Sequence, residues 1–345
     1  MRDQRFDCLK LLSMFGIVTI HGIYRSGILE QCDRFSLEWF AISVIYTFFF
    51  AMTNVFVLTS AHFMHNKSIR MDKVWNIVLL TTGYSCLIYI LLVCIGSVDF
   101  SIITFVSCML SVFTNQYWFI GAYLILYLLT PYINKLLAQL TEQELRKLCF
   151  VLFFTMSIIP TFLIFLPVST LFDADAGKGI IWFVSMYCIS FYIKQYATVW
   201  IEKVKCWKVW MFLVGNVCAL VFSRIVLFYV SNFLGMAGDG ETRLYFDSSC
   251  FVFAISVSIY ILTLKRKPIH LGKNNAWIGS LAGTTLGIYL IHEQPQLKTI
   301  LWDFVLQCKN SIGSIPAVFL SIVIVYLGSM LIEIVRQKVI KKVRK

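Results

Sequence analysis

The sequence predicts an all-α, polytopic membrane protein with about ten transmembrane helices and both termini in the cytoplasm. Of its 345 residues, 59% are apolar and only 14% are charged, whereas soluble domains contain about 25% charged residues. The mean hydropathy is +0.78. A chain of this composition cannot cover itself with polar surface, which excludes a soluble globular enzyme, a disordered protein and an ordinary nucleic-acid-binding protein.

Ten stretches are apolar for about the 20 residues that a transmembrane helix needs. They cover residues 8–29, 37–64, 74–98, 117–138, 147–167, 179–197, 208–233, 247–264, 281–302 and 315–336. Residues 100–115 are apolar but too few for a span, so we expect an interfacial or re-entrant piece there; an eleventh span would move the C-terminus outside. Because the loops are short, we expect a single transmembrane domain over residues 1–345 and no fused soluble domain.

Lys and Arg residues divide unevenly between the two sides of such a bundle. With the N-terminus inside, 23 of the 30 fall in cytoplasmic segments, 6 fall outside and Arg224 lies within a helix. This positive-inside bias is a strong orientation signal. It also accounts for the net charge of +12 without nucleic acid or another acidic partner.

Cysteine usage and the N-terminus fit this interpretation. Several of the 11 cysteines fall inside apolar stretches, where cysteine behaves as a small hydrophobe. No Cys-x-x-Cys pair suggests structural zinc, and we expect no metal site. His21, Tyr24 and Arg25 stand where a signal peptide would carry its small-residue cleavage site, so we expect the first apolar segment to be retained as a helix.

Lys10 and His21 form the most informative pair in the first helix. Their eleven-residue spacing is about three turns, so both side chains project from one face, about 16 Å apart along the axis. Lys10 would lie at the cytoplasmic edge and His21 slightly beyond the middle of the bilayer. Lys10 alone is typical of a snorkelling topology anchor, and His21 alone could be a hydrogen-bonded packing residue. Because an ionisable group at this depth is costly, a functional role is the competing interpretation.

A second group of ionisable residues lies in the run GIYLIHEQP, which carries Tyr289, His292 and Glu293. Counted from the cytoplasmic end of its helix, His292 lies about 16 Å up, close to the depth of His21. Arg224 lies on another helix, deeper toward the outside. Two interpretations remain: Arg224 and Glu293 neutralise each other as a structural pair, or these groups line an outward-facing cavity that binds a hydroxylated substrate.

Other candidate residues give weaker signals. Trp118 begins its helix at the outer interface, where aromatic belts are normal. Ser60 ends the second helix near the cytoplasm, and Lys67 and Arg70 beyond it are either topology signals or phosphate ligands. We expect the histidines in or beside cytoplasmic loops to be solvated: His62, His65 and His270.

Four runs of the sequence form a recognisable set. FDCLKLLSMFGIVTIHG places Asp7, Lys10 and His21 in an Asp-x-x-Lys-x10-His pattern, and NVFVLTSAHFM carries Ser60. The runs QYWFIGAYLILYLLTPYI and TTLGIYLIHEQP contribute Trp118, Phe119, Tyr127, Pro131, Tyr289 and His292. In this order, from the first helix to the ninth, the set resembles the membrane acyltransferase-3 family of integral membrane acyl-CoA-dependent O-acyltransferases.

The resemblance extends over nearly the whole chain, and ten helices is the usual core of the family. The sequence departs from the family pattern at three positions. Many members have arginine in place of Lys10, the usual glycine is replaced by Ala61, and Gln116 stands where some members have histidine.

By resemblance, the protein moves an acyl group, usually acetyl, from cytoplasmic acyl-CoA to a hydroxyl of a surface polysaccharide or cell-wall glycan. Acyl-CoA would be a donor substrate and not a bound cofactor. Its phosphates would meet Lys10, Lys67 and Arg70, and His21 would be the general base that takes the proton of the acceptor hydroxyl. Direct transfer and transfer through an acyl-enzyme both fit these residues.

His21 and Lys10 are therefore the expected catalytic pair, in a multi-pass protein of the plasma or inner membrane. The expected substrate-binding residues are Ser60, Lys67, Arg70, Trp118, Arg224, Tyr289, His292 and Glu293. The rival interpretation is a membrane transporter or exporter of a polysaccharide or small molecule. A transporter accounts for buried polar groups equally well, but not for the alignment of Lys10 and His21 along one face.

Overall fold

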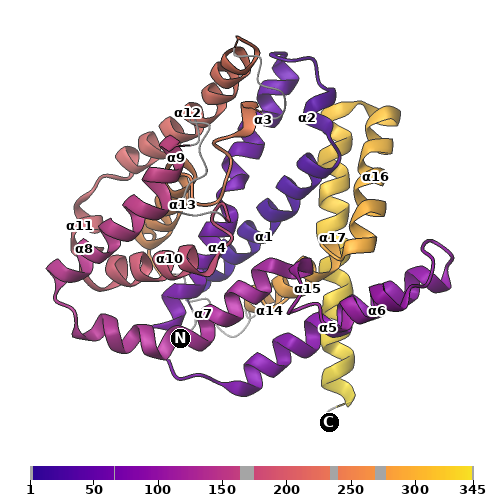
Figure 1. Ribbon diagram of the computed structural model, residues 1–345, viewed down its shortest axis with the longest axis horizontal. Coiled ribbons are helices and arrows are strands. Elements are labelled where there is room, and N and C mark those ends of the chain that lie inside the picture. Colours follow the sequence, from indigo (N-terminus) through magenta and orange to yellow (C-terminus); the bar gives the residue numbers. More distant parts are fainter. Residues whose placement is uncertain (1–2, 66, 164–174, 234–239, 269–276, 344–345) are drawn as a thin grey trace. The chain divides into compact units, whose positions relative to one another are not determined.

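The computed structural model describes residues 3–65, 67–163, 175–233, 240–268 and 277–343, and these residues form helices and loops without a β-strand (Figure 1). The predicted all-α class is confirmed. Seven helices in the described residues are long and apolar enough to cross a membrane. They are Gln4–Arg25, Leu37–Met64, Met71–Cys94, Trp118–Gln139, Glu142–Leu163, Cys206–Phe233 and Ile315–Lys342. The count of ten spans and the cytoplasmic termini stay predictions.

The apolar stretch 100–115 contains one short helix, α6 (Ile102–Met109), which the Ser101 hydroxyl caps by accepting from the Thr104 amide. Eight residues extend about 12 Å, well short of a hydrocarbon core of about 30 Å. α6 packs against α5 (Met71–Cys94). This agrees with the expected non-spanning piece.

The chain divides into two compact units that are interleaved in sequence. Unit 1 comprises residues 1–42, 70–121 and 269–345, and unit 2 comprises residues 43–69 and 122–268. Two helices run from one unit into the other, α3 (Leu37–Phe50) and α7 (Trp118–Gln139). Each unit is described below by itself.

Unit 1 is built around α1 (Gln4–Arg25), which packs against four helices from the C-terminal part of the chain. These are α14 (Trp277–Ala282), α15 (Thr285–His292), α16 (Pro295–Ile312) and α17 (Ser314–Val343). α16 and α17 lie side by side (Figure 1). The short α2 (Ile28–Gln31) follows α1 after Gly27, whose positive φ of 59° suits glycine.

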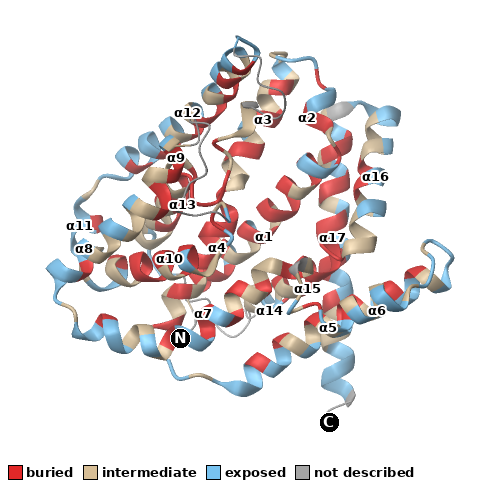
Figure 2. Cartoon of the chain, viewed as in Figure 1, coloured by how far each residue is buried: buried red, intermediate tan, exposed pale blue. Residues whose placement is uncertain are grey.

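α1 is the most enclosed of the candidate spans. Within it 67% of the most apolar window is buried, against 28% for α5, and Figure 2 shows buried residues along most of its length. At Gly22 a Cβ atom would lie 2.9 Å from Ile322 and 3.1 Å from Trp302. A residue without a side chain therefore allows α16 and α17 to approach α1 directly beside His21.

The predicted single helix over residues 281–302 is wrong, because the chain breaks between α15 and α16. α15 ends at His292, and Glu293 is its C-cap. Pro295 has no amide hydrogen and disfavours a helical residue before it, so Gln294 becomes extended with ψ of 125°. The Gln294 side chain then caps α16 by accepting from two of its first amides. The break ends α15 at His292 and Glu293, which are both buried.

Unit 2 contains the remaining helices. They are α4 (Met52–Met64), α8 (Glu142–Phe153), α9 (Ile159–Leu163), α10 (Ile180–Tyr192), α11 (Thr198–Lys203), α12 (Cys206–Phe233) and α13 (Cys250–Lys265), with π-helical segments at η2 (Phe154–Ile158) and η3 (Ile193–Ala197). α4 packs against α10 and α13. Asn54 joins them to the loop before α13, since it accepts from the Trp182 indole at 3.0 Å and donates to the Asp247 carbonyl at 2.6 Å.

Exposed positions near the helix ends allow a test of the predicted orientation. Cys206 is exposed, whereas Cys32 in the first predicted outer loop is buried and cannot report on solvent. Asn310 on α16 is exposed, and the predicted topology puts it outside. We expect an impermeant thiol reagent on intact cells to label Asn310→Cys and to spare Cys206, as measured by mass spectrometry of the two peptides. Labelling of Cys206 alone would invert the topology.

Candidate active site

Four ionisable side chains meet at the end of α1 and the end of α15 in unit 1. His21 Nδ1 lies 3.1 Å from His292 Nε2 and 3.2 Å from Glu293 Oε1. Arg25, one turn after His21, donates from Nε at 3.1 Å and from Nη2 at 2.8 Å to the two oxygens of Glu293. The predicted similar depth of His21 and His292 is confirmed, since the two rings are in contact.

The hydrogen bonds determine which nitrogen of His21 carries its hydrogen. His292 Nδ1 lies 2.6 Å from the carbonyl oxygen of Ile288. A carbonyl only accepts, so His292 Nδ1 is the donor, and the neutral ring keeps its lone pair on Nε2. That lone pair and Glu293 Oε1 both face His21 Nδ1, which must therefore carry hydrogen. The lone pair of neutral His21 is then on Nε2.

The two histidines differ in access. His292 is fully buried at 0% exposure, and the Glu293 side chain is 9% exposed, whereas the His21 side chain keeps 24% of its surface. Only His21 can meet a reactant without a rearrangement of the helices. A carboxylate as buried as Glu293 is costly unless it is paired, and the two-pronged contact with Arg25 supplies that pairing.

Aromatic side chains pack around the end of α15. The Tyr289 ring lies 5.9 Å, centroid to centroid, from the rings of Tyr117, Phe119 and His292. Trp118, which begins α7 as expected, packs edge-on against Phe119. The runs QYWF and GIYLIHE, far apart in sequence, therefore meet in unit 1.

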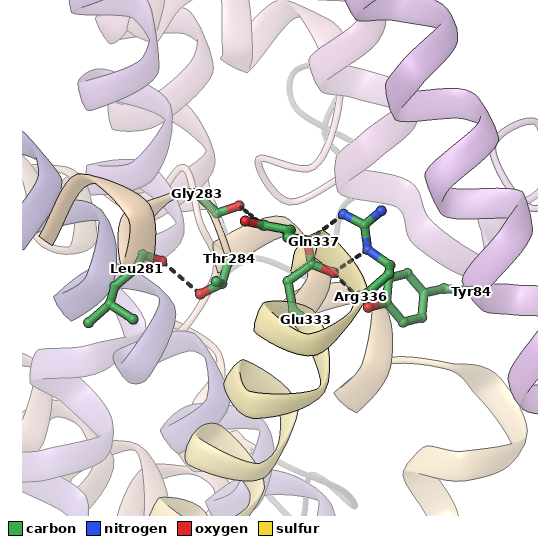
Figure 3. A network of polar contacts seen from close by, with 7 residues as sticks. All are labelled: Tyr84, Leu281, Gly283, Thr284, Glu333, Arg336 and Gln337. Atoms are coloured by element: carbon green, nitrogen blue, oxygen red, sulfur yellow. Dashed lines mark hydrogen bonds and ion pairs between the residues drawn. The ribbon is translucent and has the colours of Figure 1, made fainter. Parts of the chain in front are cut away.

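A second buried carboxylate, Glu333 of α17, connects three elements of unit 1 (Figure 3). Its oxygens accept from the Tyr84 hydroxyl of α5 at 2.6 Å and from Arg336 at 2.6 and 2.7 Å. Gln337 donates to Glu333 at 2.8 Å and to the carbonyl of Gly283, just before α15, at 3.2 Å. The network fixes α5 and α17 relative to the start of α15.

Gly287 of α15 lies directly against the Glu333 carboxylate. A Cβ atom at this position would lie 2.5 Å from Oε2 and 2.6 Å from Cδ of Glu333. α15 can approach α17 this closely only because position 287 has no side chain. The contact lies five residues before His292, so it helps to place the end of α15 that supports His21.

Two of the other predicted residues also lie in unit 1. Lys10 is half-buried on α1, three turns before His21. Arg70 precedes α5 and forks onto the Asp72 carboxylate at 2.6 and 3.3 Å. A pocket of about 280 Å³ opens there; its lining residues are Arg70, Asp72, Lys73, Asn76, Ile77, Leu80 and Leu286.

Ser60 and Lys67 lie in unit 2, at and just after the end of α4. The expectation of solvated histidines in this region is wrong for His65, which is buried between the rings of Tyr187 and Phe191. The half-buried His62 bonds through Nδ1 to a tyrosine hydroxyl on α13. His270 lies outside the described residues. The sequence misled for His65 because it precedes a polar loop, while aromatic side chains of α10 cover it.

The predicted pair of Arg224 and Glu293 is also wrong. Arg224 is 1% exposed and forms an ion pair with Glu241 at 3.0 Å, with its guanidinium 5.5 Å from the centre of the Tyr245 ring. Glu293 is paired with Arg25. Helix depth showed that the two charges needed partners, but it could not show that each finds one within its own unit.

Sequence reasoning missed Arg25 and Glu333. Arg25 was counted as a topology residue, although its spacing of four from His21 puts both on one helix face. Glu333 is an ionisable residue inside an otherwise apolar span, which by itself marks a constrained site.

The ligand atoms of His21, His292 and Glu293 lie within 4.8 Å of one another, a spacing that a metal ion could bridge. The Arg25 guanidinium already engages both oxygens of Glu293. A metal ion there would face this positive charge at close range, and the Ile288 carbonyl and Arg25 satisfy the outer atoms of the group. The hydrogen-bond network therefore accounts for the arrangement by itself.

Comparison with known proteins agrees with these observations. The family model of the acyltransferase-3 family, described as an acyltransferase domain, matches residues 3–334. No curated protein and no solved structure matches the chain significantly.

The close approach at Gly287 gives a test of how α15 is held. Gly287→Ala should push the Glu333 carboxylate aside and destabilise the protein by about 1–3 kcal/mol, as overpacking typically does. The matched control is Gly328→Ala on α17, where a Cβ atom meets nothing within 4 Å. Thermal unfolding of the purified proteins in detergent should give a lower midpoint for Gly287→Ala only. Equal midpoints would contradict the tight contact.

Proposed function

The chain belongs to the acyltransferase-3 family, and on this premise we propose that it is a membrane O-acyltransferase that moves an acetyl group from cytoplasmic acyl-CoA to a hydroxyl of a surface polysaccharide or cell-wall glycan. The observation that carries the proposal is the orientation of His21. Its Nδ1 is committed to His292 and Glu293, which leaves the lone pair of the half-buried ring on Nε2.

In the proposed reaction the acceptor hydroxyl attacks the thioester carbonyl of acyl-CoA. His21 Nε2 takes the hydroxyl proton as the new C–O bond forms. The C–S bond then breaks, and the imidazolium returns the proton to the departing thiolate, so the products are an ester and free coenzyme A. The general base is thereby regenerated in its starting tautomer.

Three neighbours act through His21 and are positioning residues. Glu293 faces the Nδ1 hydrogen and would stabilise the imidazolium while the proton is on the ring, as a buried carboxylate does in a hydrolase triad. His292 selects the tautomer because its own Nδ1 is held by Ile288. Arg25 keeps Glu293 ionised and aimed at His21 by holding both of its oxygens.

Acyl-CoA is the proposed donor, as a substrate and not as a bound cofactor. Lys10 on α1 and the Arg70 pocket are the candidate contacts for its phosphates in unit 1, and Lys67 in unit 2. Arg70 would have to exchange its exposed Asp72 partner for phosphate, which costs little because exposed ion pairs contribute little to stability.

The acceptor side is proposed to involve the aromatic end of α15. Trp118 is half-buried and offers a ring of the kind that packs against sugar rings, and the buried Tyr289 supports this end by packing against Phe119. The sequence places Ser60 among the substrate contacts on the donor side. We assign Arg224 to the stability of unit 2, because it is 1% exposed and paired with Glu241.

Transport of a polysaccharide or small molecule is the competing function. Buried polar groups and histidine proton relays also occur in transporters. The two functions separate in a chemical experiment. Membranes with the protein and [14C]acetyl-CoA should release free thiol and acquire label in glycan, and mild base should remove that label as acetate. Absence of transferred label in all glycan fractions would favour transport.

His21→Ala should reduce acyl transfer by about 10²–10⁴-fold, the contribution typical of a general base. Its abundance should stay near wild type, since one lost hydrogen bond between membrane helices costs about 0.6 kcal/mol and Glu293 keeps its ion pair with Arg25. The matched control is Tyr24→Ala, an exposed residue on the same turn of α1, which should keep full activity. An active His21→Ala protein at normal abundance would refute the assignment of the base.

Lys10 provides a separate test of donor binding. Lys10→Arg should retain transfer because charge and reach are kept. Lys10→Glu should raise the KM for acetyl-CoA with a smaller effect on kcat, since a reversed charge repels phosphate. Equal kinetics for the two variants would reduce Lys10 to a topology anchor.

A further inference from the structure

A group of basic side chains gathers in unit 2, where α4 ends beside the π-helical segment η3. Lys194 of η3 donates from Nζ to the backbone carbonyl of His62 at 2.8 Å. Lys67 follows three residues after Met64, the last residue of α4. His62 and His65 complete the group. The mechanism proposed above assigns no role to Lys194, His62 or His65.

The positive charges of Lys67 and Lys194 act on each other. Lys67 lies close enough to Lys194 for like-charge repulsion. Lys194 and His62 likewise disfavour a positive charge on His65. Among the described residues, no carboxylate lies within ion-pair distance of Lys67 or Lys194, and no acidic group acts on Lys194 or His65. Both lysines are exposed, and like charges gathered on one surface raise its affinity for anions.

His65 adds a second observation. It is 8% exposed, with its ring 5.0 Å from the Tyr187 ring and 5.1 Å from the Phe191 ring. Among the described residues, its Nε2 is buried without a hydrogen-bond partner. A buried polar atom left unpaired is costly, and it indicates a place where a bound polar group would gain a contact.

A topology anchor does not explain this arrangement. Lysines that only mark the cytoplasmic side extend their ammonium groups into water. The Lys194 ammonium instead donates to the His62 carbonyl in the last turn of α4, and the Lys67 ammonium lies over the Phe63 ring of the same turn, 5.9 Å from its centroid. The π-helical geometry of η3 shifts Lys194 out of the regular α-helical register, and π-segments frequently occur at functional sites.

We propose that Lys67 and Lys194 bind a phosphate group, and, resting on the proposed function, that this phosphate belongs to the acyl-CoA donor. Lys194 is the additional basic residue beside Lys67 in unit 2, whereas Arg70 forks onto Asp72. Ser60 lies two residues before His62 in the last turns of α4. The serine that matches the family's second-helix motif is therefore at the same helix end as the proposed phosphate site.

The test measures coenzyme A binding to the full-length protein purified in detergent. Lys194→Gln keeps a hydrogen-bond donor near the His62 carbonyl and removes the charge, and Lys67→Gln removes the other charge. Each should weaken coenzyme A binding about tenfold or more, the loss expected for one charge-assisted contact, and reduce its salt dependence. Lys194→Arg should bind within about threefold of wild type because the charge is kept.

The matched control is Lys203→Gln, an exposed lysine at the end of α11 in the same helical stretch. It should bind coenzyme A like wild type. If Lys67→Gln and Lys194→Gln bind coenzyme A as well as Lys203→Gln does, the donor assignment is overturned. The midpoint of thermal unfolding of each variant verifies that the comparison is made between folded proteins.

Two further measurements separate the possible sources of phosphate and the two proposals. Nanodiscs of phosphatidylcholine with and without phosphatidylglycerol test for a lipid headgroup. One outcome is that phosphatidylglycerol stabilises the wild type but not Lys194→Gln, while both bind coenzyme A equally. That result would keep the phosphate site and overturn the donor assignment. His21→Ala should bind coenzyme A normally. A different result is that Lys194→Gln loses coenzyme A binding while the wild type transfers no acyl group. This would overturn the proposed function and leave the phosphate site valid.

Discussion

Glu293 carries its charge where only 9% of its side chain reaches solvent, and the two hydrogen bonds from Arg25 make that position tolerable. A buried carboxylate without this partner would cost several kcal/mol. Because Arg25 lies one turn after His21, the same contact joins the end of α1 to the end of α15 and brings Glu293 to His21. The break before Pro295 frees this helix end, and the glycine contacts of Gly22 and Gly287 let neighbouring helices close around it. The pairing of the Glu293 charge with Arg25 therefore holds together the two helix ends that form the site.

Composition and hydropathy were sufficient to predict the fold class. In lipid the backbone polar groups must bond within the chain, and helices satisfy this requirement within each segment. Helical geometry was sufficient to align Lys10 with His21 and to predict the depth that His21 shares with His292. The break at Pro295 was visible in the sequence as a proline, but the apolar count outweighed it. The partner of Arg224 was not predictable, since depth along a helix does not say which helices face each other. The burial of His65 was hidden for the same reason: tertiary packing, and not local sequence, covers it.

The two units divide the chemistry. Unit 1 holds the His21 base with its buried support, and unit 2 holds the basic group around Lys194 at the end of α4. α3 and α7 run from one unit into the other, so the chain itself links the two tasks. α7 begins at Trp118, beside the aromatic contacts of Tyr289, and continues into unit 2.

The tautomer of His21 is the most direct test of this account. The chain has five histidines, so nitrogen-15 spectra of the histidine-labelled protein can be assigned by single substitutions. The account predicts that at neutral pH His21 carries hydrogen on Nδ1 and a lone pair on Nε2, and that Glu293→Gln weakens this preference. A hydrogen on Nε2 of His21 in the wild-type protein would contradict it, because that nitrogen would then have no lone pair to take the acceptor proton.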